Sequence, residues 1–395
     1  MNVVFFEENR TAFLPLVYTK PIAKLRLGIL MIEEKWEKYL SRVMEESLHF
    51  SYLTESYLSE KFPVEIKEEN LFVNASFCPN EQTVELLQSA LGIKEALAYK
   101  DTIVVAKCSK EEFDNKSYNV KNLEKPFFGI QLEKITDLFT ENSVAIELDY
   151  QLLTEGRTSQ TISSTNTLIG GRVFIEEGAK VEAAILNSNE GPIYIGKNAE
   201  IMEGSIVRGG LALCEGAVLK LGTKVYGPTT VGMYSKIGGE VNNSVIQDYS
   251  NKGHDGFLGN SVIGEWCNLG ADTNTSNLKN NYSEVKLWSY IVNDYQSSGL
   301  TFCGLIMGDH SKCGINTMFN TGTMVGVNAN IFGGDFPPKF IPSYSWGGAQ
   351  GFSTYDLTKS FDVAKKVMER RGVELTQQDQ SILTAIFERT ARFRK

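Results

Sequence analysis

The sequence predicts a parallel β-helix that follows an α/β domain and precedes a short helical segment. Three observations support this fold class. Aliphatic residues recur at every sixth position over roughly half of the 395 residues, the first 150 residues lack that period, and the last 50 return to helical spacing. We therefore expect an α/β domain at 1–150, a linker at 151–165, the β-helix at 166–345 and a helical tail at 346–395.

The front domain shows alternating strand and helix patterns. Runs of β-branched and aromatic residues predict strands at 3–6, 71–74 and 102–106. Helical spacing of apolar residues predicts helices at 29–39 and 81–91. A Ser/Thr-rich connector then separates this region from the first repeat.

The hexapeptide repeat predicts a triangular prism. Three short strands make one coil, so every sixth side chain points inward and stacks on its counterpart in the next coil. The inward positions are Ile169, Ile175, Val181, Ile195, Ile201, Val207, Leu213, Leu219, Val225, Val231, Ile237, Phe257, Ile263, Leu269, Met307, Cys313, Phe319, Val325 and Ile331. An excursion interrupts the coils at 276–300. Such a prism can be only an oligomerisation stalk, or it can carry a site on its surface.

The end of the chain predicts two helices, at 357–371 and 376–394, divided at Gly372. They would cap the last coil of the prism.

Composition excludes several function classes. The net charge of −9 argues against nucleic acid as a partner, because phosphate binding needs clustered basic residues. The six cysteines show no CxxC spacing and suit the reduced core of a cytoplasmic protein. The sequence shows no signal peptide and no apolar run long enough to span a bilayer, so we expect no membrane partner.

The densest polar cluster within the repeat lies at 251–277 and contains His254. The inward period fails just before it, at Asn243 and Tyr249, so we expect the prism to bulge outward there. Histidine is the side chain most readily used as a base near neutral pH. An ordinary surface histidine is the alternative, and the polar neighbours favour a site: Lys252, Asp255, Asn268 and Asn277.

The segment KGHDGFLG…IGEWCNLGAD…N…EVK resembles the acetyltransferase signature of the bifunctional N-acetylglucosamine-1-phosphate uridylyltransferase/glucosamine-1-phosphate acetyltransferase family. The spacing agrees from the histidine through both asparagines, and GDHSKCGINTMFNTGTMVG resembles the family's coil beside coenzyme A. The resemblance implies a left-handed β-helix, a homotrimer and acetyl-CoA as cosubstrate.

The same resemblance implies roles for individual residues. His254 would be the general base, and Asn268 and Lys286 would hold the sugar substrate. Lys224 or Lys252 would supply positive charge for the sugar phosphate.

Ala271, Asn277 and Asn316 would bind the cofactor arm or acetyl group. Three residues depart from the family pattern: Phe257 for Tyr, Asp272 for Gly, and Asn242 for a phosphate-binding Lys.

The opening segment ENRTAFLPLVYTKPIAKL resembles that of sugar-1-phosphate nucleotidyltransferases, which implies nucleotide contacts for Arg10 and Lys20. The family's Gly-rich phosphate loop is replaced here by residues that include Glu7 and Glu8, which would repel a triphosphate unless Mg²⁺ lay between them. Asn74 stands where a metal-binding Asp is usual. An active and a degenerate nucleotide-sugar domain both remain open.

The leading hypothesis is amino-sugar nucleotide synthesis, with acetyl transfer to glucosamine 1-phosphate on the prism and uridylyl transfer in the front domain. The alternatives are a nucleotidyltransferase, for example a thymidylyltransferase, whose β-helix serves only oligomerisation, and a non-catalytic sugar-nucleotide sensor.

Overall fold

A computed structural model describes residues 1–44 and 46–394. Its contacts divide the chain into two compact units. The front unit comprises Met1–Phe13, Lys20–Leu25 and Leu30–Glu133, and the second unit comprises Leu14–Thr19, Arg26–Ile29 and Lys134–Lys395. Residues 134–150, which the sequence assigned to the front domain, thus pack with the β-helix. No helix among the described residues is long and apolar enough to cross a membrane.

The front unit is built on a six-stranded sheet. In spatial order its strands are β4 (His49–Leu53), β1 (Asn2–Phe6), β5 (Asn70–Asn74), β8 (Thr102–Cys108), β7 (Glu95–Tyr99) and β9 (Asn119–Leu123). β1 pairs in parallel with β4 and β5, and β7 pairs in parallel with β9, whereas β8 runs antiparallel to both neighbours. The carboxyl ends of five strands therefore share one edge, where α/β sheets commonly bind ligands.

Three α-helices belong to this unit: α1 (Ile32–Ser41), α2 (Glu81–Ala90) and α3 (Lys110–Asp114). Its smaller elements are η1 (Arg10–Phe13), η3 (Ile22–Lys24), η4 (Ser56–Leu58), β3 (Leu30–Met31), β6 (Phe77–Cys78) and β10 (Ile130–Gln131). The five elements predicted from sequence are all present. The first helix begins later than predicted, because Met31 is extended and its amide donates to the Glu34 carboxylate at 2.6 Å, which caps the helix.

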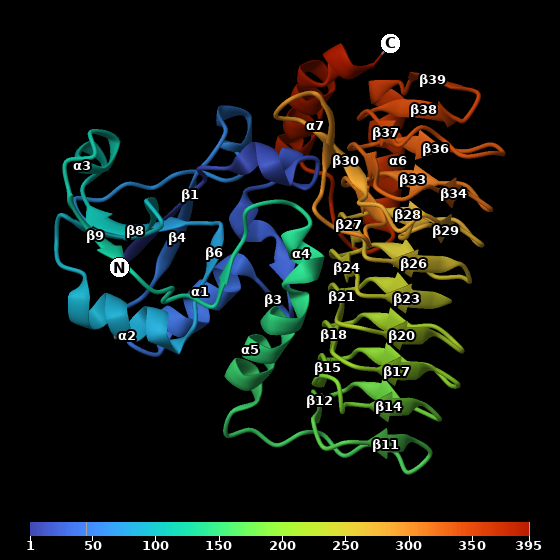
Figure 1. The fold of residues 1–395 in the computed structure, drawn as a ribbon, viewed down its shortest axis with the longest axis horizontal. Helices are drawn as coiled ribbons and strands as arrows, with labels where there is room; N and C mark the ends of the chain where they lie inside the picture. Colours follow the sequence, from blue (N-terminus) through green and yellow to red (C-terminus); the bar gives the residue numbers. More distant parts are fainter. Residues whose placement is uncertain (45, 395) are drawn as a thin grey trace. The chain divides into compact units, whose positions relative to one another are not determined.

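The second unit contains a parallel β-helix with three faces (Figure 1). One face consists of β11 (Thr167–Ile169), β14 (Ile185–Asn187), β17 (Ile206–Arg208), β20 (Lys224–Tyr226), β23 (Glu240–Asn242) and β26 (Phe257–Gly259), and β29 (Asn274–Thr275) and β34 (Met318–Phe319) form a separate pair. Another consists of β12 (Val173–Ile175), β15 (Ile193–Ile195), β18 (Leu211–Leu213), β21 (Thr229–Val231), β24 (Val245–Ile246), β27 (Val262–Ile263), β32 (Leu305–Met307), β35 (Thr323–Val325) and β37 (Phe340–Ile341). The last consists of β13 (Lys180–Val181), β16 (Glu200–Ile201), β19 (Val218–Leu219), β22 (Lys236–Ile237), β25 (Asn251–Lys252), β28 (Asn268–Leu269), β33 (Lys312–Cys313), β36 (Asn330–Ile331), β38 (Ser345–Gly348) and β39 (Gly351–Thr354). The predicted architecture is confirmed; its left-handed sense stays a prediction.

The predicted inward residues form a continuous apolar interior from Ile175 to Ile341. Phe257 and Ile169 are exceptions. Phe257 is half-buried and pairs with Glu240, whereas its neighbour Leu258, which pairs with Val241, is the interior residue. Ile169 pairs with Asn187 and is exposed, whereas Leu168 is the residue in register with buried Leu186. Leu168 is itself exposed because β11 has a paired strand on one side only.

The expected outward bulge before His254 is wrong, because the coils become shorter there. Leu219 pairs with Ile237, and Ile237 in turn pairs with Lys252, which follows it more closely in the sequence. The residues are lost before Tyr249, because Val225 already pairs with Val241 and Val231 with Ile246. Asn243 and Tyr249 therefore lie at corners with positive φ, at 42° and 60°, and not at inward positions. Parallel pairing continues without a gap through β25 and β26.

The predicted excursion is confirmed as an antiparallel hairpin of β30 (Lys286–Ser289) and β31 (Asp294–Ser297), while β27 pairs directly with β32. The two predicted terminal helices are α6 (Leu357–Glu369) and α7 (Gln377–Arg389), followed by η5 (Ala391–Phe393). The buried hydroxyl of Tyr344 donates to the Leu383 carbonyl at 2.8 Å, which ties α7 to the last coils.

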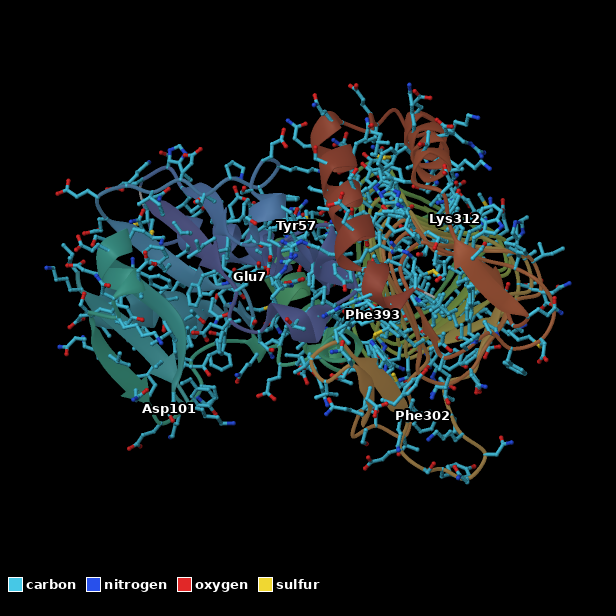
Figure 2. All side chains as sticks on the ribbon, turned by 90° about the horizontal axis from the view of Figure 1, so that it is seen from above. Glu7, Tyr57, Asp101, Phe302, Lys312 and Phe393 are labelled. Atoms are coloured by element: carbon cyan, nitrogen blue, oxygen red, sulfur yellow. The ribbon has the colours of Figure 1, made fainter. Side chains whose placement is uncertain are left out.

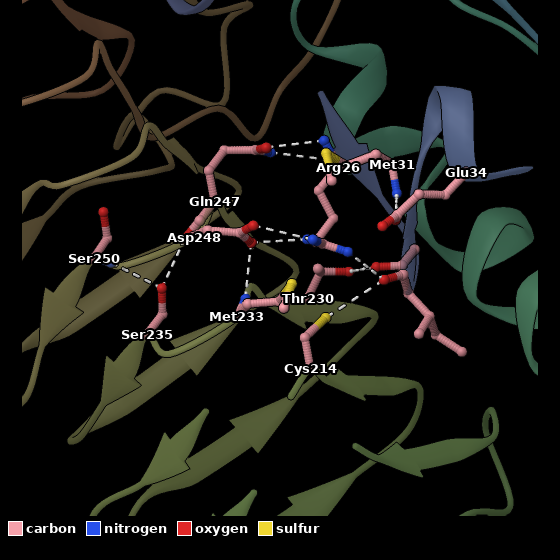
Figure 3. Close-up of polar contacts among 12 residues, drawn as sticks. Arg26, Met31, Glu34, Cys214, Thr230, Met233, Ser235, Gln247, Asp248 and Ser250 are labelled. Atoms are coloured by element: carbon pink, nitrogen blue, oxygen red, sulfur yellow. Dashed lines mark hydrogen bonds and ion pairs between the residues drawn. The ribbon is translucent and has the colours of Figure 1, made fainter. Parts of the chain in front are cut away.

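A short segment of the early chain belongs to the second unit through polar contacts (Figure 3). The remaining elements of that unit are η2 (Leu16–Tyr18), β2 (Arg26–Leu27), α4 (Asp137–Thr140) and α5 (Asn142–Thr154). The Arg26 guanidinium binds both oxygens of Asp248, at 2.9 and 3.0 Å, and the Arg26 backbone exchanges two hydrogen bonds with the Gln247 amide. Asn142 and Asp149 accept from the amides of Gly28 and Ile29. These bonds explain why α5 packs with the β-helix.

Candidate active site

His254 lies on an exposed bend between β25 and β26. The backbone of this bend is held from inside the prism. The Lys252 ammonium donates to the His254 carbonyl at 2.8 Å and to the Gly238 carbonyl, one coil away, at 2.9 Å. The bend thus presents the imidazole side chain at the surface while its backbone is anchored.

Glycines in neighbouring coils make room for this bend. A Cβ at Gly239 would lie 2.8 Å from the Asp255 Cα, and Gly239 also adopts a φ of +75°. A Cβ at Gly256 would lie 2.2 Å from the Thr273 carbonyl oxygen, at a φ of +116°. The close approach of three successive coils therefore requires glycine at both positions.

Lys252 occupies an interior position, in register with Ile237 and only 3% exposed. Burial lowers the pKa of its ammonium to about 8, against weaker opposite effects of nearby acidic groups and Cys313. The sequence proposed Lys252 as a substrate contact. The structure instead places its charged end on two backbone carbonyls.

Asn268 and Ala271 lie on the coil next to the His254 bend, and Asn316 lies on the coil after that one. Asn268 is exposed and is the register partner of Asn251, at the start of β25. The Asp272 amide donates to the Asp255 carbonyl at 3.0 Å, and the Asn316 amide donates to the Ala271 carbonyl at 2.8 Å. The structure thus brings the predicted base, one substrate residue and two cofactor residues onto consecutive coils.

Asn277 follows β29, and its side-chain amide donates to the Asn260 side chain at 2.8 Å, beyond the end of β26. Phe257 adjoins the same region, since its amide donates to Asn274 at 2.9 Å. Lys286 is exposed on the β30–β31 hairpin, outside the coils that carry His254. Asn277 therefore lies beside the end of β26, whereas Lys286 lies on a separate element.

Lys224 lies on the same face of the prism as Phe257. Lys224 pairs in register with Glu240, which pairs with Phe257, and the ammonium is 3.7 Å from the Glu240 carboxylate. Both side chains are substantially exposed. Lys224 can therefore reach an anionic group outside the prism.

Sequence reasoning missed two anchoring features. The first is the interior direction of Lys252, which a shorter coil spacing would have revealed. The second is Lys312 (Figure 2), whose ammonium donates to the His310 carbonyl at 2.8 Å. Burial lowers the pKa of this ammonium to about 8. Lys312 is the register partner of Asn268. The motif GDHSKCGIN contains Lys312, but the motif does not show that its ammonium turns back onto the backbone.

In the front unit, Arg10 and Lys20 come together. The Arg10 guanidinium donates to the Lys20 carbonyl at 3.1 Å and to both Glu7 oxygens at 2.8 and 2.9 Å. Glu7 also accepts from the Thr54 hydroxyl and the Ile22 amide. The Arg10 guanidinium, which the resemblance assigned to nucleotide binding, is therefore already paired with the carboxylate of Glu7.

Asn74, at the end of β5, donates to the Ile103 carbonyl at 3.0 Å and to Glu8 at 3.3 Å. Within residues 1–44 and 46–394, no three His, Cys, Asp or Glu side chains group as metal ligands. Mg²⁺ brought by a nucleotide stays a prediction.

Comparisons with known proteins support both halves of the sequence argument. Residues 3–158 match the model of the family described as sugar nucleotidyl transferase. The chain is 36% identical over 92 residues to the bifunctional protein GlmU of Methanocaldococcus jannaschii, which covers 23% of this chain and 22% of that protein. It is 29% identical over 191 residues to the bifunctional sugar-1-phosphate nucleotidylyltransferase/acetyltransferase of Sulfurisphaera tokodaii. This match covers 48% of this chain and 47% of that protein.

These matches span less than half the length of either relative. Among solved structures, the UDP-N-acetylglucosamine acyltransferase of Francisella novicida matches 58% of this chain and 85% of that chain, at 12% identity and a TM-score of 0.24. The family match in the front region and the similarity to bifunctional relatives confirm the resemblance to the bifunctional uridylyltransferase/acetyltransferase family, with a sugar nucleotidyl transferase domain in front.

Proposed function

We propose that the β-helix transfers an acetyl group from acetyl-CoA to the amine of glucosamine 1-phosphate. The observation that carries this proposal is the His254 bend. It presents an exposed imidazole beside the coils that carry Asn268 and Ala271, and its backbone is anchored from within by Lys252. A stalk used only for oligomerisation would not need a lysine in its apolar interior, because a buried ammonium costs stability.

In the proposed step, the sugar amine attacks the thioester carbonyl carbon and His254 accepts the proton from the amine nitrogen. The carbon–sulfur bond then breaks, coenzyme A leaves as a thiolate, and the protonated imidazole returns the proton to that sulfur. Positioning and one base can supply most of the acceleration, because an amine is already a nucleophile. Asn268 would orient the acceptor, and Lys224 would attract its phosphate.

The cosubstrate would lie along the coils of Ala271 and Asn316, whose backbones are joined by a hydrogen bond. Asn277, held by Asn260, would contact the same molecule from the next strand. One flat prism face cannot enclose both coenzyme A and a sugar. We therefore propose a homotrimer in which faces of neighbouring copies form the cleft.

The test is an acceptor panel with purified full-length protein. Release of free thiol from acetyl-CoA is measured with glucosamine 1-phosphate, glucosamine, and a non-amino sugar phosphate. Thiol release that requires both the amine and the phosphate would support the proposal. A rate at background with every acceptor, from protein whose mass by light scattering is trimeric, would sink it and favour a structural role.

Uridylyl transfer from UTP to N-acetylglucosamine 1-phosphate in the front domain is a second candidate, favoured by the family match at 3–158. Because Glu7 already neutralises Arg10, we expect this activity to be slow. Pyrophosphate release with UTP and with dTTP measures it and separates uridylyl from thymidylyl transfer. Nucleotide binding without pyrophosphate release would favour the sensor alternative.

A further inference from the structure

Four basic side chains of the second unit gather without a carboxylate partner. This basic cluster consists of Lys220 and Lys236 on the β-helix and Arg370 and Arg371 at the end of α6. Within residues 1–44 and 46–394, none of the four forms an ion pair. The chain as a whole carries a net charge of −9, so the cluster is a local feature and not part of a generally basic surface.

The register of the β-helix brings the two lysines together. β19 pairs with β22, so Val218 lies opposite Lys236 and Leu219 lies opposite the interior Ile237. Lys220 follows β19, and its amide donates to the Ile237 carbonyl at 2.8 Å. Because side chains alternate along a strand, Lys220 projects from the same outer surface as Lys236.

The end of α6 adds the two arginines. Arg370 is the C-cap residue of this helix. The Arg371 guanidinium donates to the Asn251 side-chain oxygen at 3.3 Å, and Asn251 is the register partner of Lys236 on the next coil. The amide of Asn251 is neutral, so this contact positions the guanidinium without neutralising its charge.

The four charges act on one another. Burial lowers the pKa of the Lys236 ammonium, and the charges of Arg371, Lys220 and Arg370 lower it further. The carboxylate of Glu200 has the opposite and smallest effect. The free protein therefore holds like charges close together, and a bound anion would relieve their repulsion.

A structural role accounts for only part of the cluster. The negative end of a helix dipole favours arginine at the end of α6, which explains Arg370 and Arg371. Lys220 and Lys236 belong to the β-helix, where no such dipole ends. The lysines are therefore the part of the cluster that calls for an anion.

We propose that the basic cluster binds a diphosphate group at a site separate from that of acetyl transfer. One phosphate monoester carries about −1.5 to −2 charges at neutral pH, so four cations match two phosphates. The arginine forks can each hold two phosphate oxygens, and the lysines contribute compact charge. None of the four side chains has a role in the proposed acetyl transfer, so this inference does not rest on that function.

The experiment measures binding to the full-length chain by calorimetry, at constant ionic strength and without divalent cations. The probes are pyrophosphate, UDP and inorganic phosphate. We expect pyrophosphate to bind with Kd below about 1 mM and inorganic phosphate to bind about tenfold more weakly or less tightly still. Binding of UDP as tight as that of pyrophosphate identifies the diphosphate of a nucleotide, and binding of pyrophosphate without UDP identifies the free diphosphate.

Two methionine variants place the binding. Lys236→Met keeps the length of the half-buried side chain and removes its charge, so pyrophosphate should bind about tenfold more weakly or worse. Lys365→Met is the matched control, because Lys365 lies on the same helix α6 but is 65% exposed and lies 3.9 Å from Glu369. This control should bind pyrophosphate as the parent does. Lys220→Met gives the same comparison if Lys236→Met does not fold.

Thermal unfolding provides an independent readout. Pyrophosphate should raise the melting temperature of the parent, and Lys236→Met should raise it in the absence of any anion, because each relieves the repulsion within the cluster. Sodium chloride at the same ionic strength should give a smaller rise than pyrophosphate.

The proposal is overturned if pyrophosphate does not bind at about 10 mM, if inorganic phosphate binds as tightly, or if the Lys236 and Lys365 variants bind alike. Displacement of pyrophosphate by acetyl-CoA would also overturn it, since the cluster would then belong to the acetyl-transfer site. Failure of acetyl-CoA to bind at all would count against the proposed function and would leave the pyrophosphate result unaffected.

Discussion

A buried cation has different hydrogen-bond partners in the two units. In the front unit the Arg10 guanidinium ends on the Glu7 carboxylate, so a protein group fills the place proposed for a phosphate. In the β-helix the Lys252 ammonium ends on backbone carbonyls, and the consequence is an anchored bend that presents His254. Both cations stand at positions where the family resemblance suggested ligand contacts.

The difference shows that the role of a charged motif residue depends on which groups its charged end contacts. A cation that ends on an internal carboxylate has lost most of its attraction for a phosphate, because the pair is nearly neutral. A cation that ends on neutral carbonyls remains charged but acts on the backbone. The exposed groups beside it are then the ones that can reach a substrate.

The largest expected effect concerns His254, on the bend that Lys252 anchors in the β-helix. His254→Ala should lower acetyl transfer by about 10²- to 10⁴-fold, because a positioned base is lost, with no loss of thermal stability since the side chain is exposed. His49→Ala is the matched control, because His49 is an exposed histidine of the front unit. Activity within threefold of the parent across neutral pH would show that another group is the base.

The fold could be predicted largely from sequence because its two periods are local. The hexapeptide spacing identified interior residues such as Leu219 and Ile237, and helical spacing of apolar residues identified helices such as α2. The prediction failed at Asn243 and Tyr249 because it assumed coils of constant length. The coil instead loses residues between Ile237 and Ile246, which moves Asn243 and Tyr249 off the inward positions without breaking the parallel pairing.

The candidate site could be predicted only in part. A motif covers His254 and Asn268, and the structure places both on the surface of neighbouring coils, while their roles stay predictions. The bond between Arg10 and Glu7 and the interior direction of Lys252 depend on three-dimensional partners, which spacing does not encode. The sequence shows that Arg10 and Lys252 carry positive charge. It did not predict what either cation contacts.

The front half of the comparison is tested by Arg10→Ala and Glu7→Gln. The Arg10–Glu7 pair is largely buried, with side-chain exposures of 11% and 3%. Arg10→Ala should therefore destabilise the protein by about 3–5 kcal/mol, because an unpaired carboxylate stays buried. Glu7→Gln should cost less and should tighten UTP binding, since the Arg10 charge is no longer neutralised. Chemical denaturation and calorimetry measure the two effects.

If Arg10→Ala unfolds the protein, Glu7→Gln alone still decides the point. Unchanged or weaker UTP binding in a folded Glu7→Gln variant would show that Glu7 does not compete with a nucleotide. Robust pyrophosphate release that survives replacement of both Arg10 and Lys20 would place the nucleotide elsewhere.

Lys252→Met tests the anchoring role with a smaller effect. Methionine fills the same interior space but donates no hydrogen bond to the Gly238 and His254 carbonyls. We expect acetyl transfer to fall about tenfold through a lower kcat, because the bend loses its anchor and the base is misplaced. A change confined to KM for the sugar phosphate would instead show that Lys252 contacts substrate directly.

The same variant has a pH signature. The Lys252 pKa is lowered from 10.5 to about 8, so between these values the unfolded chain holds a proton that the folded chain lacks. The free energy of unfolding should therefore rise with pH from 8 to 10.5 on account of this group, by at most about 3 kcal/mol. In Lys252→Met, the slope of the free energy of unfolding against pH in this range should fall by the amount that corresponds to about one bound proton. An unchanged slope would contradict the burial of this ammonium.

The smallest expected effect concerns Lys224, the exposed cation of the β-helix. Its pairing with Glu240 at 3.7 Å is exposed, so Lys224→Ala should change stability by less than about 0.5 kcal/mol. If Lys224 attracts the sugar phosphate, the variant should raise KM for glucosamine 1-phosphate about fivefold and leave kcat unchanged. Arg208→Ala is the matched control, because Arg208 lies on the neighbouring strand β17 in a similarly exposed pair with Glu190. Equal KM values in the two variants would exclude a phosphate contact for Lys224, and the cation that meets the sugar phosphate would then have to come from another face or another copy of the chain.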